Sequence, residues 1–218
     1  MSSPAALLFD LDGTLVDSIE LILRSVEHAF AGRDGPHPTR EGWIAGIGTP
    51  LTAQLSPFAR DDADLNALID TYRTFQQANR DRLARAYDGT VDVLTALHER
   101  GHPTALVTSR MTELAGEYLA HVGLAPFVDV VIGADDTARH KPDPEPVLLA
   151  LRRLGASAGR ALFLGDSPHD IRAGNAAGVV SVAALWGPFT RAQLAAASPA
   201  HYLDRPAELP ALVEHLFA

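Results

Sequence analysis

The chain has 218 residues, no cysteine and a net charge of -9 at pH 7, a length that suits one domain or one domain with a large insertion. The acidic balance argues against a nucleic-acid surface, which needs clustered Lys and Arg. No apolar run approaches the roughly 18 residues of a membrane span, and the first residues lack the features of a secretory signal. We therefore expect a cytoplasmic protein with neither nucleic acid nor membrane as a partner, whose metal ligands would be oxygen or imidazole.

The segment from Ala5 to Ser18 begins as an apolar run and ends in two carboxylates, Asp10 and Asp12. A short apolar run of this kind predicts an interior strand of a parallel sheet. Ligands of open α/β sheets lie beyond the carboxyl ends of such strands, so both side chains are expected in the active crevice. Two like charges held this close need a cation or a shared proton between them.

The next part of the chain, residues 16–88, shows helical periodicity and no strand-like alternation. Asp17 and the residues after it indicate a capped helix start, and a second helix is expected near Thr39. From Asp61 to about Tyr87, apolar residues recur as one helical stripe. The sequence therefore predicts an all-α insert between the first strand and the rest of the sheet.

After the insert, strands and helices alternate to the end of the chain. Strands are expected at 104–108, 128–132, 161–164 and 179–183, with a further edge strand at 201–203. Alternation of this kind gives βαβ units, so the expected fold class is α/β, with a Rossmann-like, doubly wound parallel sheet.

Four motifs follow one another along this pattern: Asp10-Leu-Asp-Gly-Thr-Leu-Val-Asp-Ser, Leu-Val-Thr108-Ser109, His-Lys141-Pro-Asp-Pro and Gly-Asp166-Ser-Pro-His-Asp. In this order they resemble the motifs of the haloacid dehalogenase-like hydrolases, and the resemblance covers essentially the whole chain. It implies a core domain of residues 1–15 and 89–218, with residues 16–88 as a helical cap domain.

The resemblance also implies a chemistry for the acidic residues. Asp10 would be the nucleophile and Asp12 the general acid and base. A carboxylate that attacks a phosphate dianion needs a hard cation, and Mg²⁺ prefers oxygen ligands. The expected ligands are the carboxylates of Asp10 and Asp166 with the backbone carbonyl of Asp12, and Asp170 would orient the water shell or Lys141 from the second shell.

The remaining site residues would bind the phosphoryl group. Gly13 can bring backbone N–H groups to a phosphoryl oxygen, and Thr108 and Ser109 can offer hydroxyl and backbone donors where a strand meets a helix. Lys141, the only lysine in the chain, would place a positive charge over the phosphoryl group. Thr108 and Lys141 are thus counted as catalytic and substrate-binding. Arg110 is a possible phosphate contact, but a position at a surface helix start is the expectation.

The expected function is that of a Mg²⁺-dependent phosphatase for a small soluble phosphate monoester, most similar to the phosphoglycolate phosphatase branch. A pyrophosphatase and a β-phosphoglucomutase-like mutase share the same catalytic residues and remain alternatives, and a noncatalytic binding module is a third. Phosphonate cleavage through a cap lysine is excluded because residues 16–88 contain none. Specificity is expected from the cap segment around residues 46–51, in a monomer or homodimer.

Overall fold

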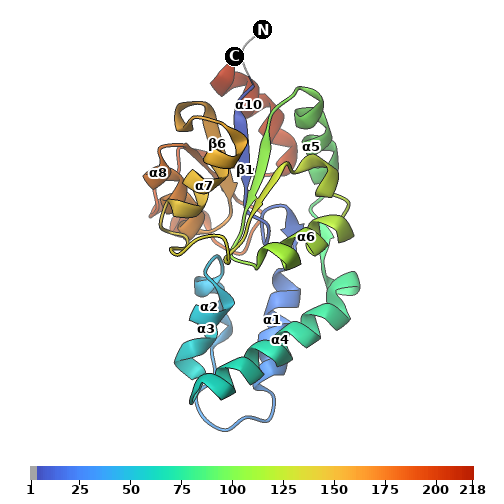
Figure 1. The fold of residues 1–218 in the computed structure, drawn as a ribbon, viewed down its shortest axis with the longest axis vertical. Coiled ribbons are helices and arrows are strands. Elements are labelled where there is room, and N and C mark those ends of the chain that lie inside the picture. The colour runs from blue at the N-terminus through green and yellow to red at the C-terminus, as the bar shows by residue number, and fades with distance from the viewer. Residues whose placement is uncertain (1–3) are drawn as a thin grey trace.

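The computed structural model describes residues 4–218 and confirms the α/β, Rossmann-like fold (Figure 1). Six parallel strands form one sheet in the order β5-β4-β1-β6-β7-β8. Their bounds are β1 (Ala6–Phe9), β4 (Thr104–Val107), β5 (Val130–Ile132), β6 (Ala161–Gly165), β7 (Val180–Ala184) and β8 (His201–Leu203). The first strand lies inside the sheet, between β4 and β6, as its continuous apolar run predicted.

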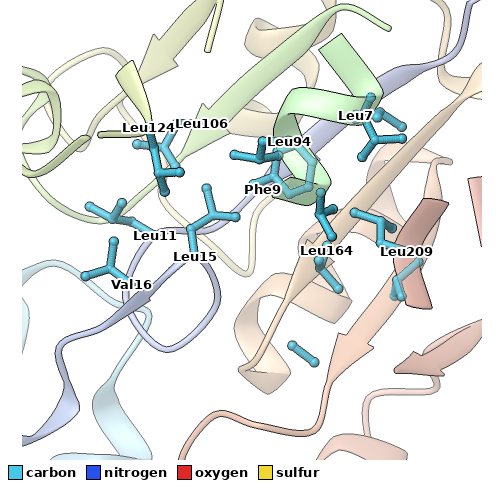
Figure 2. Packing of buried hydrophobic residues seen from close by; sticks show 14 of the residues in the cluster. Leu7, Phe9, Leu11, Leu15, Val16, Leu94, Leu106, Leu124, Leu164 and Leu209 are labelled. Atoms are coloured by element: carbon cyan, nitrogen blue, oxygen red, sulfur yellow. The ribbon is translucent and has the colours of Figure 1, made fainter. Parts of the chain in front are cut away.

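Helices cover both faces of this sheet because alternate residues of each strand point to opposite sides. On one face, Leu7 and Phe9 pack with α5 (Thr90–Glu99), α6 (Thr112–His121) and α10 (Leu209–Phe217) in the cluster of Figure 2. On the other face, Leu8 packs with α7 (Glu145–Leu154) and α8 (Pro168–Ala177). A short helix, α9 (Arg191–Ala195), precedes the edge strand β8.

A second group of helices lies beyond the carboxyl end of β1, below the sheet in Figure 1. It consists of α1 (Ile19–Phe30), α2 (Arg40–Gly46), α3 (Leu51–Leu55) and α4 (Asp62–Leu83). Their apolar faces share a buried cluster that includes Val26, Trp43 and Leu68 and that continues into core residues such as Ile171. None of the helices found within residues 4–218 is long and apolar enough to cross a bilayer.

The junction between the two groups differs from the sequence prediction. Helix α4 ends at Leu83, and the two-residue strands β2 (Val16–Asp17) and β3 (Arg85–Ala86) pair antiparallel there. Asp17 therefore does not cap α1, whose N-cap is Ser18 without a side-chain bond, and its carboxylate accepts a hydrogen bond from Arg85 at 3.1 Å. Strand pairing across the junction overrides the local capping pattern. The division of the chain into core and cap domains stays a prediction.

Candidate active site

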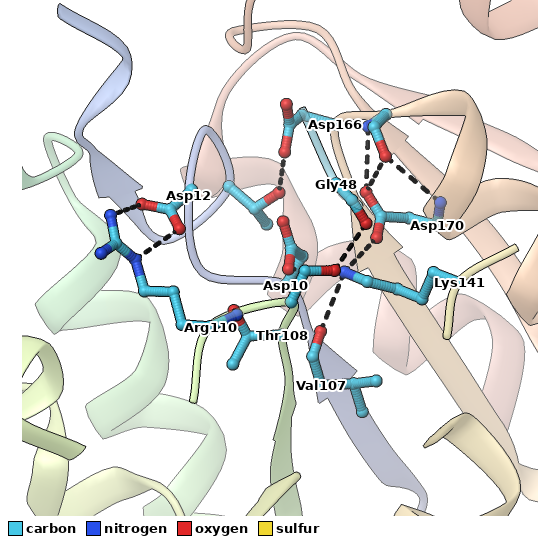
Figure 3. Close-up of polar contacts among 12 residues, drawn as sticks. Asp10, Asp12, Gly48, Val107, Thr108, Arg110, Lys141, Asp166 and Asp170 are labelled. Atoms are coloured by element: carbon cyan, nitrogen blue, oxygen red, sulfur yellow. Dashed lines mark hydrogen bonds and ion pairs between the residues drawn. The ribbon is translucent and has the colours of Figure 1, made fainter. Parts of the chain in front are cut away.

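The four sequence motifs meet at one edge of the sheet. Asp10 follows β1, Thr108 follows β4 and Asp166 follows β6, and these three strands are parallel neighbours. Their carboxyl ends therefore lie side by side, as expected for a ligand site of an open α/β sheet. Lys141, on the loop between β5 and α7, brings its side chain to the same place (Figure 3).

Lys141 is the centre of a buried ion-pair network. Its ammonium Nζ donates to Asp10 Oδ1 at 2.7 Å, to Asp170 Oδ1 at 2.6 Å and to the Val107 carbonyl at 3.1 Å. Only 3% of the residue is exposed. Burial by itself would lower the pKa of Lys141, but the attraction of the two carboxylates outweighs it and raises that pKa. The lysine therefore keeps its positive charge although it is buried.

Three buried aspartates surround this single cation. Asp10, Asp166 and Asp170 each offer a carboxylate oxygen within 4.8 Å of the other two. Burial raises the pKa of Asp10 to about 7 and holds the pKa of Asp166 well above its usual value. The nearby carboxylates add to both shifts, because the single charge of Lys141 cannot neutralise three ionised carboxylates.

The donor set fits a hard divalent cation. Asp166 Oδ1 accepts a hydrogen bond from Thr14 Oγ1 at 2.7 Å, whereas its buried Oδ2 has no hydrogen-bond partner among residues 4–218. An unpartnered buried carboxylate oxygen is costly unless a cation satisfies it. Asp170 differs, because Lys141 occupies its Oδ1 and the backbone N–H and hydroxyl of Ser167 occupy its Oδ2.

Two glycines allow the chain to approach Asp166. Gly13 has φ +82°, and a Cβ added there would lie 2.5 Å from Asp166 Oδ2. At Gly187, in the loop after β7, an added Cβ would lie 2.4 Å from the Asp166 Cβ. Next to it, Trp186 donates from Nε1 to the Thr14 carbonyl at 2.9 Å. Sequence reasoning missed Trp186 and Gly187, because Trp-Gly-Pro indicates a turn and not what the turn contacts.

Asp12 faces away from the three aspartates and forms an ion pair with Arg110. The guanidinium donates from Nε to Asp12 Oδ2 at 2.7 Å and from Nη2 to Oδ1 at 2.8 Å, and Ser18 Oγ also donates to Oδ1. Arg110 lies over the Tyr118 ring, 4.0 Å from its centroid, and donates from Nη1 to Gln76 Oε1 of α4 at 2.8 Å. The expected surface position for Arg110 is therefore wrong.

The error has a physical reason. Arg110 precedes α6, which begins at Thr112, and its long side chain turns back between Tyr118 of that helix and the carboxylate of Asp12. Its side chain is 11% exposed. Opposite charge and an aromatic face can bury an arginine that a local pattern assigns to the surface.

Thr108 and Ser109 lie at the expected strand end. Thr108 is buried, and its Oγ1 accepts from the backbone N–H of Arg110 at 3.2 Å. The Ser109 hydroxyl instead donates to the Gly48 carbonyl at 2.6 Å and so joins the core to the loop between α2 and α3. The N-cap of α6 is Met111 without a side-chain bond, so neither hydroxyl residue caps that helix.

A cavity of about 120 Å³ lies between the two groups of helices. Its core side includes Asp10, Asp12 and Arg110 together with the apolar residues Met111 and Leu114. Apolar residues of the helical group, among them Ile22, Ile47 and Leu51, line the opposite side. The acidic residues and the 47–51 segment of the expected cap thus face one small space.

Comparisons with known proteins agree with this geometry. The family model described as haloacid dehalogenase-like hydrolase matches residues 7–184. The chain is 34% identical over 204 residues to the pyrophosphatase PpaX of Bacillus velezensis, with 94% of each chain covered. It is 39% identical over 173 residues to the pyrophosphatase PpaX of Halalkalibacterium halodurans, with 79% of each covered.

Among solved structures, the fold is similar to that of a predicted phosphoglycolate phosphatase from Haemophilus somnus, with a TM-score of 0.87 at 23% identity, over 97% of this chain and 99% of that one. The architecture and the clustered acids define an α/β protein with an acidic site at the carboxyl ends of its parallel strands. The chain belongs to the haloacid dehalogenase-like hydrolases.

Proposed function

We propose that this hydrolase is a Mg²⁺-dependent phosphatase that acts on a small phosphate monoester through an aspartyl-phosphate, as phosphoglycolate phosphatases are expected to do. The observation that carries the proposal is the state of Asp10. Lys141 donates to its Oδ1 at 2.7 Å, and no hydrogen bond to its Oδ2 is found among residues 4–218. Asp10 lines the cavity together with Asp12, so the free oxygen belongs to a side chain that a substrate can reach.

Asp10 and Asp166 are the side chains proposed to hold Mg²⁺, with the backbone carbonyl of Asp12. A bound Mg²⁺ offsets the repulsion between these carboxylates and a phosphate dianion. Asp170 would act one shell further out, since its contacts with Lys141 and Ser167 already fix its carboxylate.

The first half-reaction would use Asp10 and Asp12. Asp10 Oδ2 attacks the phosphorus atom, the bond between phosphorus and the leaving oxygen breaks, and the Asp12 carboxyl gives a proton to that oxygen. Lys141, Gly13, Thr108 and Ser109 would bind the transferred group through their ammonium, backbone N–H and hydroxyl donors.

The second half-reaction returns the enzyme to its starting state. A water molecule attacks the phosphorus of the aspartyl-phosphate, and Asp12 takes a proton from that water. The bond from phosphorus to Asp10 breaks and inorganic phosphate leaves. Exclusion of bulk water from the cavity between residues 16–88 and the rest of the chain would keep the intermediate from uncontrolled hydrolysis.

The apolar wall of the cavity favours an ester with an organic part over a purely inorganic substrate. A specific observation favours a second candidate, pyrophosphate hydrolysis: two relatives that cover most of this chain are called pyrophosphatases. Both reactions would use the same residues and differ only in the leaving group.

A panel of phosphate compounds tests the proposal. Phosphoglycolate, simple alkyl and sugar phosphates and pyrophosphate would be incubated with the protein in Mg²⁺ and in excess chelator. We expect turnover that depends on Mg²⁺ and a phosphorylated Asp10 during turnover, trapped by acid quench and located by borohydride reduction and mass spectrometry. Turnover in chelator would contradict the metal assignment, and the absence of a phosphorylated Asp10 under single-turnover conditions would indicate direct attack by water.

A further inference from the structure

Arg110 is a buried cation at the cavity wall that the proposed chemistry does not use. The residue lies beyond Asp12 as seen from Asp10 in Figure 3, and it lines the same cavity as these two aspartates. The phosphoryl group itself would already be bound by Lys141 and by the cation that Asp10 and Asp166 are proposed to hold. Arg110 is therefore placed to contact the part of a substrate that does not react.

The hydrogen bonds of Arg110 leave donors free. A guanidinium carries five N–H groups in a fixed plane. One from Nε and one from Nη2 go to Asp12, and one from Nη1 goes to Gln76. The hydrogen bonds found among residues 4–218 thus use three of the five and leave one N–H on each Nη atom for a substrate. A carboxylate or phosphate can accept from two guanidinium N–H groups at once.

The position of the guanidinium is fixed from several sides before any substrate binds. Tyr118 lies under its plane, and Gln76 is itself held, because its Nε2 donates to Tyr72 Oη at 3.0 Å. Its side-chain amide therefore presents Oε1 to Arg110 in a defined orientation. A preorganised cation costs little further entropy on binding.

We propose that Arg110 is a specificity-determining residue that binds a second anionic group on the substrate. The inference rests on the proposed phosphatase function and narrows its substrate class to phosphate compounds in which a carboxylate or second phosphate lies a short linker from the reacting phosphorus.

Matched substrate pairs separate this role from a general loss of activity. Phosphoglycolate would be compared with 2-hydroxyethyl phosphate, and pyrophosphate with acetyl phosphate, in the wild type, Arg110→Met and Arg110→Lys. For wild type we expect a higher kcat/KM for the member with the second anion in at least one pair, and the pair that shows it identifies a carboxylate or a phosphate as the second group. Arg110→Met should reduce this preference about 10- to 100-fold, the effect of losing charged hydrogen bonds, and Arg110→Lys should reduce it less.

Arg80→Met is the matched control. Arg80 also lies over the Tyr118 ring, at 5.6 Å, but its charge pairs with Glu117 and it is not among the residues that line the cavity. Its removal should leave the substrate preference unchanged. An equal loss for both members of each pair in Arg110→Met would overturn the proposal and leave Arg110 as a residue that only positions Asp12.

Binding of unreactive analogues keeps this test independent of turnover. By calorimetry, phosphonoacetate or methylenediphosphonate should bind wild type more tightly than methylphosphonate, and Arg110→Met should remove the difference. Equal binding of all three analogues to wild type would contradict the role of Arg110. Binding with the expected preference but without hydrolysis of any phosphate compound would instead contradict the proposed phosphatase function.

Discussion

Two clusters of charged residues in this molecule are built around buried aspartates and have opposite ratios of cations to carboxylates. In the helical group, the single carboxylate of Asp64 accepts bidentate bonds from Arg33 at 2.7 and 3.0 Å and further bonds from Arg60. At the sheet edge, Asp10, Asp166 and Asp170 share one Lys141. The first cluster has a surplus of cations and the second a surplus of carboxylates.

The pKa shifts follow this difference. Hydrogen bonds from Arg33 and Arg60 hold the pKa of Asp64 well below its usual range, whereas burial raises the pKa of Asp10 to about 7. The same residue type therefore stabilises the fold in one place, and in the other it forms the carboxylate cluster that we propose binds a cation. In this chain, the buried site with too few cations for its carboxylates is the proposed active site. The Asp64 site, whose carboxylate is paired with two arginines, stabilises the fold.

The largest expected effect comes from Asp10→Asn. The amide keeps the shape of the side chain but is a poor nucleophile, so phosphatase turnover should fall by several orders of magnitude. Circular dichroism and the melting temperature should show an intact fold. Turnover near the wild-type rate would remove Asp10 from the proposed nucleophilic role.

Lys141→Met tests how far the sheet-edge cluster depends on its one cation for stability. Three buried aspartates would lose their only ammonium partner, and breaking a buried ion pair in this way costs about 3–5 kcal/mol of unfolding free energy. Urea unfolding in chelator measures this loss, and added Mg²⁺ should recover part of it by binding the folded state. A variant as stable as wild type in chelator would show that the cluster does not depend on this charge.

Asp64→Asn tests the Asp64 cluster through the pH dependence of folding stability. Because the folded pKa of Asp64 is lowered, its contribution to stability is fully present above the unfolded pKa of about 4 and is lost as pH falls. The variant should therefore be less stable than wild type at neutral pH, and the difference should shrink below about pH 4. Asp62→Asn, an exposed residue in the same helical turn, is the control that should show little change.

The raised pKa of Asp10 gives the opposite pH dependence. In chelator, the folded state binds this proton more tightly than the unfolded chain, so the contribution of Asp10 is favourable at low pH and is lost as pH rises to about 7. Comparing urea midpoints of wild type and Asp10→Asn across this range measures it. A pH-independent difference between the two proteins would contradict the assigned cause.

Trp186→Phe should have the smallest effect. It removes the indole donor to the Thr14 carbonyl, and Thr14 in turn orients Asp166, while a ring remains to pack against Tyr87. Since the contact is indirect, we expect Mg²⁺ affinity to fall by less than about tenfold, below the range for direct partners of metal ligands. Trp43→Phe, in the helical group, should leave the affinity unchanged.

The sequence predicted those parts of the molecule that depend on local pattern and motif order. Asp10, Thr108 and Asp166 each follow an apolar strand, so parallel pairing had to bring them together. Lys141 was found through its position between motifs. The parallel sheet, the helices between its strands and the edge strand at 201–203 follow from the same alternation of elements, whereas the order of the strands was not predicted.

Other features depend on how distant segments meet, which a local pattern does not contain. The burial of Arg110 requires Gln76, from a helix that is distant in sequence. The junction strands β2 and β3 are only two residues each and leave no period to detect. The contact of Trp186 with Thr14 joins residues 172 positions apart. All three arise from packing of one part of the chain on another.

Calorimetric titration of Mg²⁺ into wild type and Asp166→Asn tests the central claim that the sheet-edge carboxylates form a Mg²⁺ site. The substitution removes the carboxylate whose Oδ2 has no partner within residues 4–218 and leaves Lys141 paired with Asp10 and Asp170. We expect saturable binding to wild type and its loss in the variant, with Asp64→Asn binding as wild type does. Equal binding of Mg²⁺ to wild type and Asp166→Asn would contradict the account.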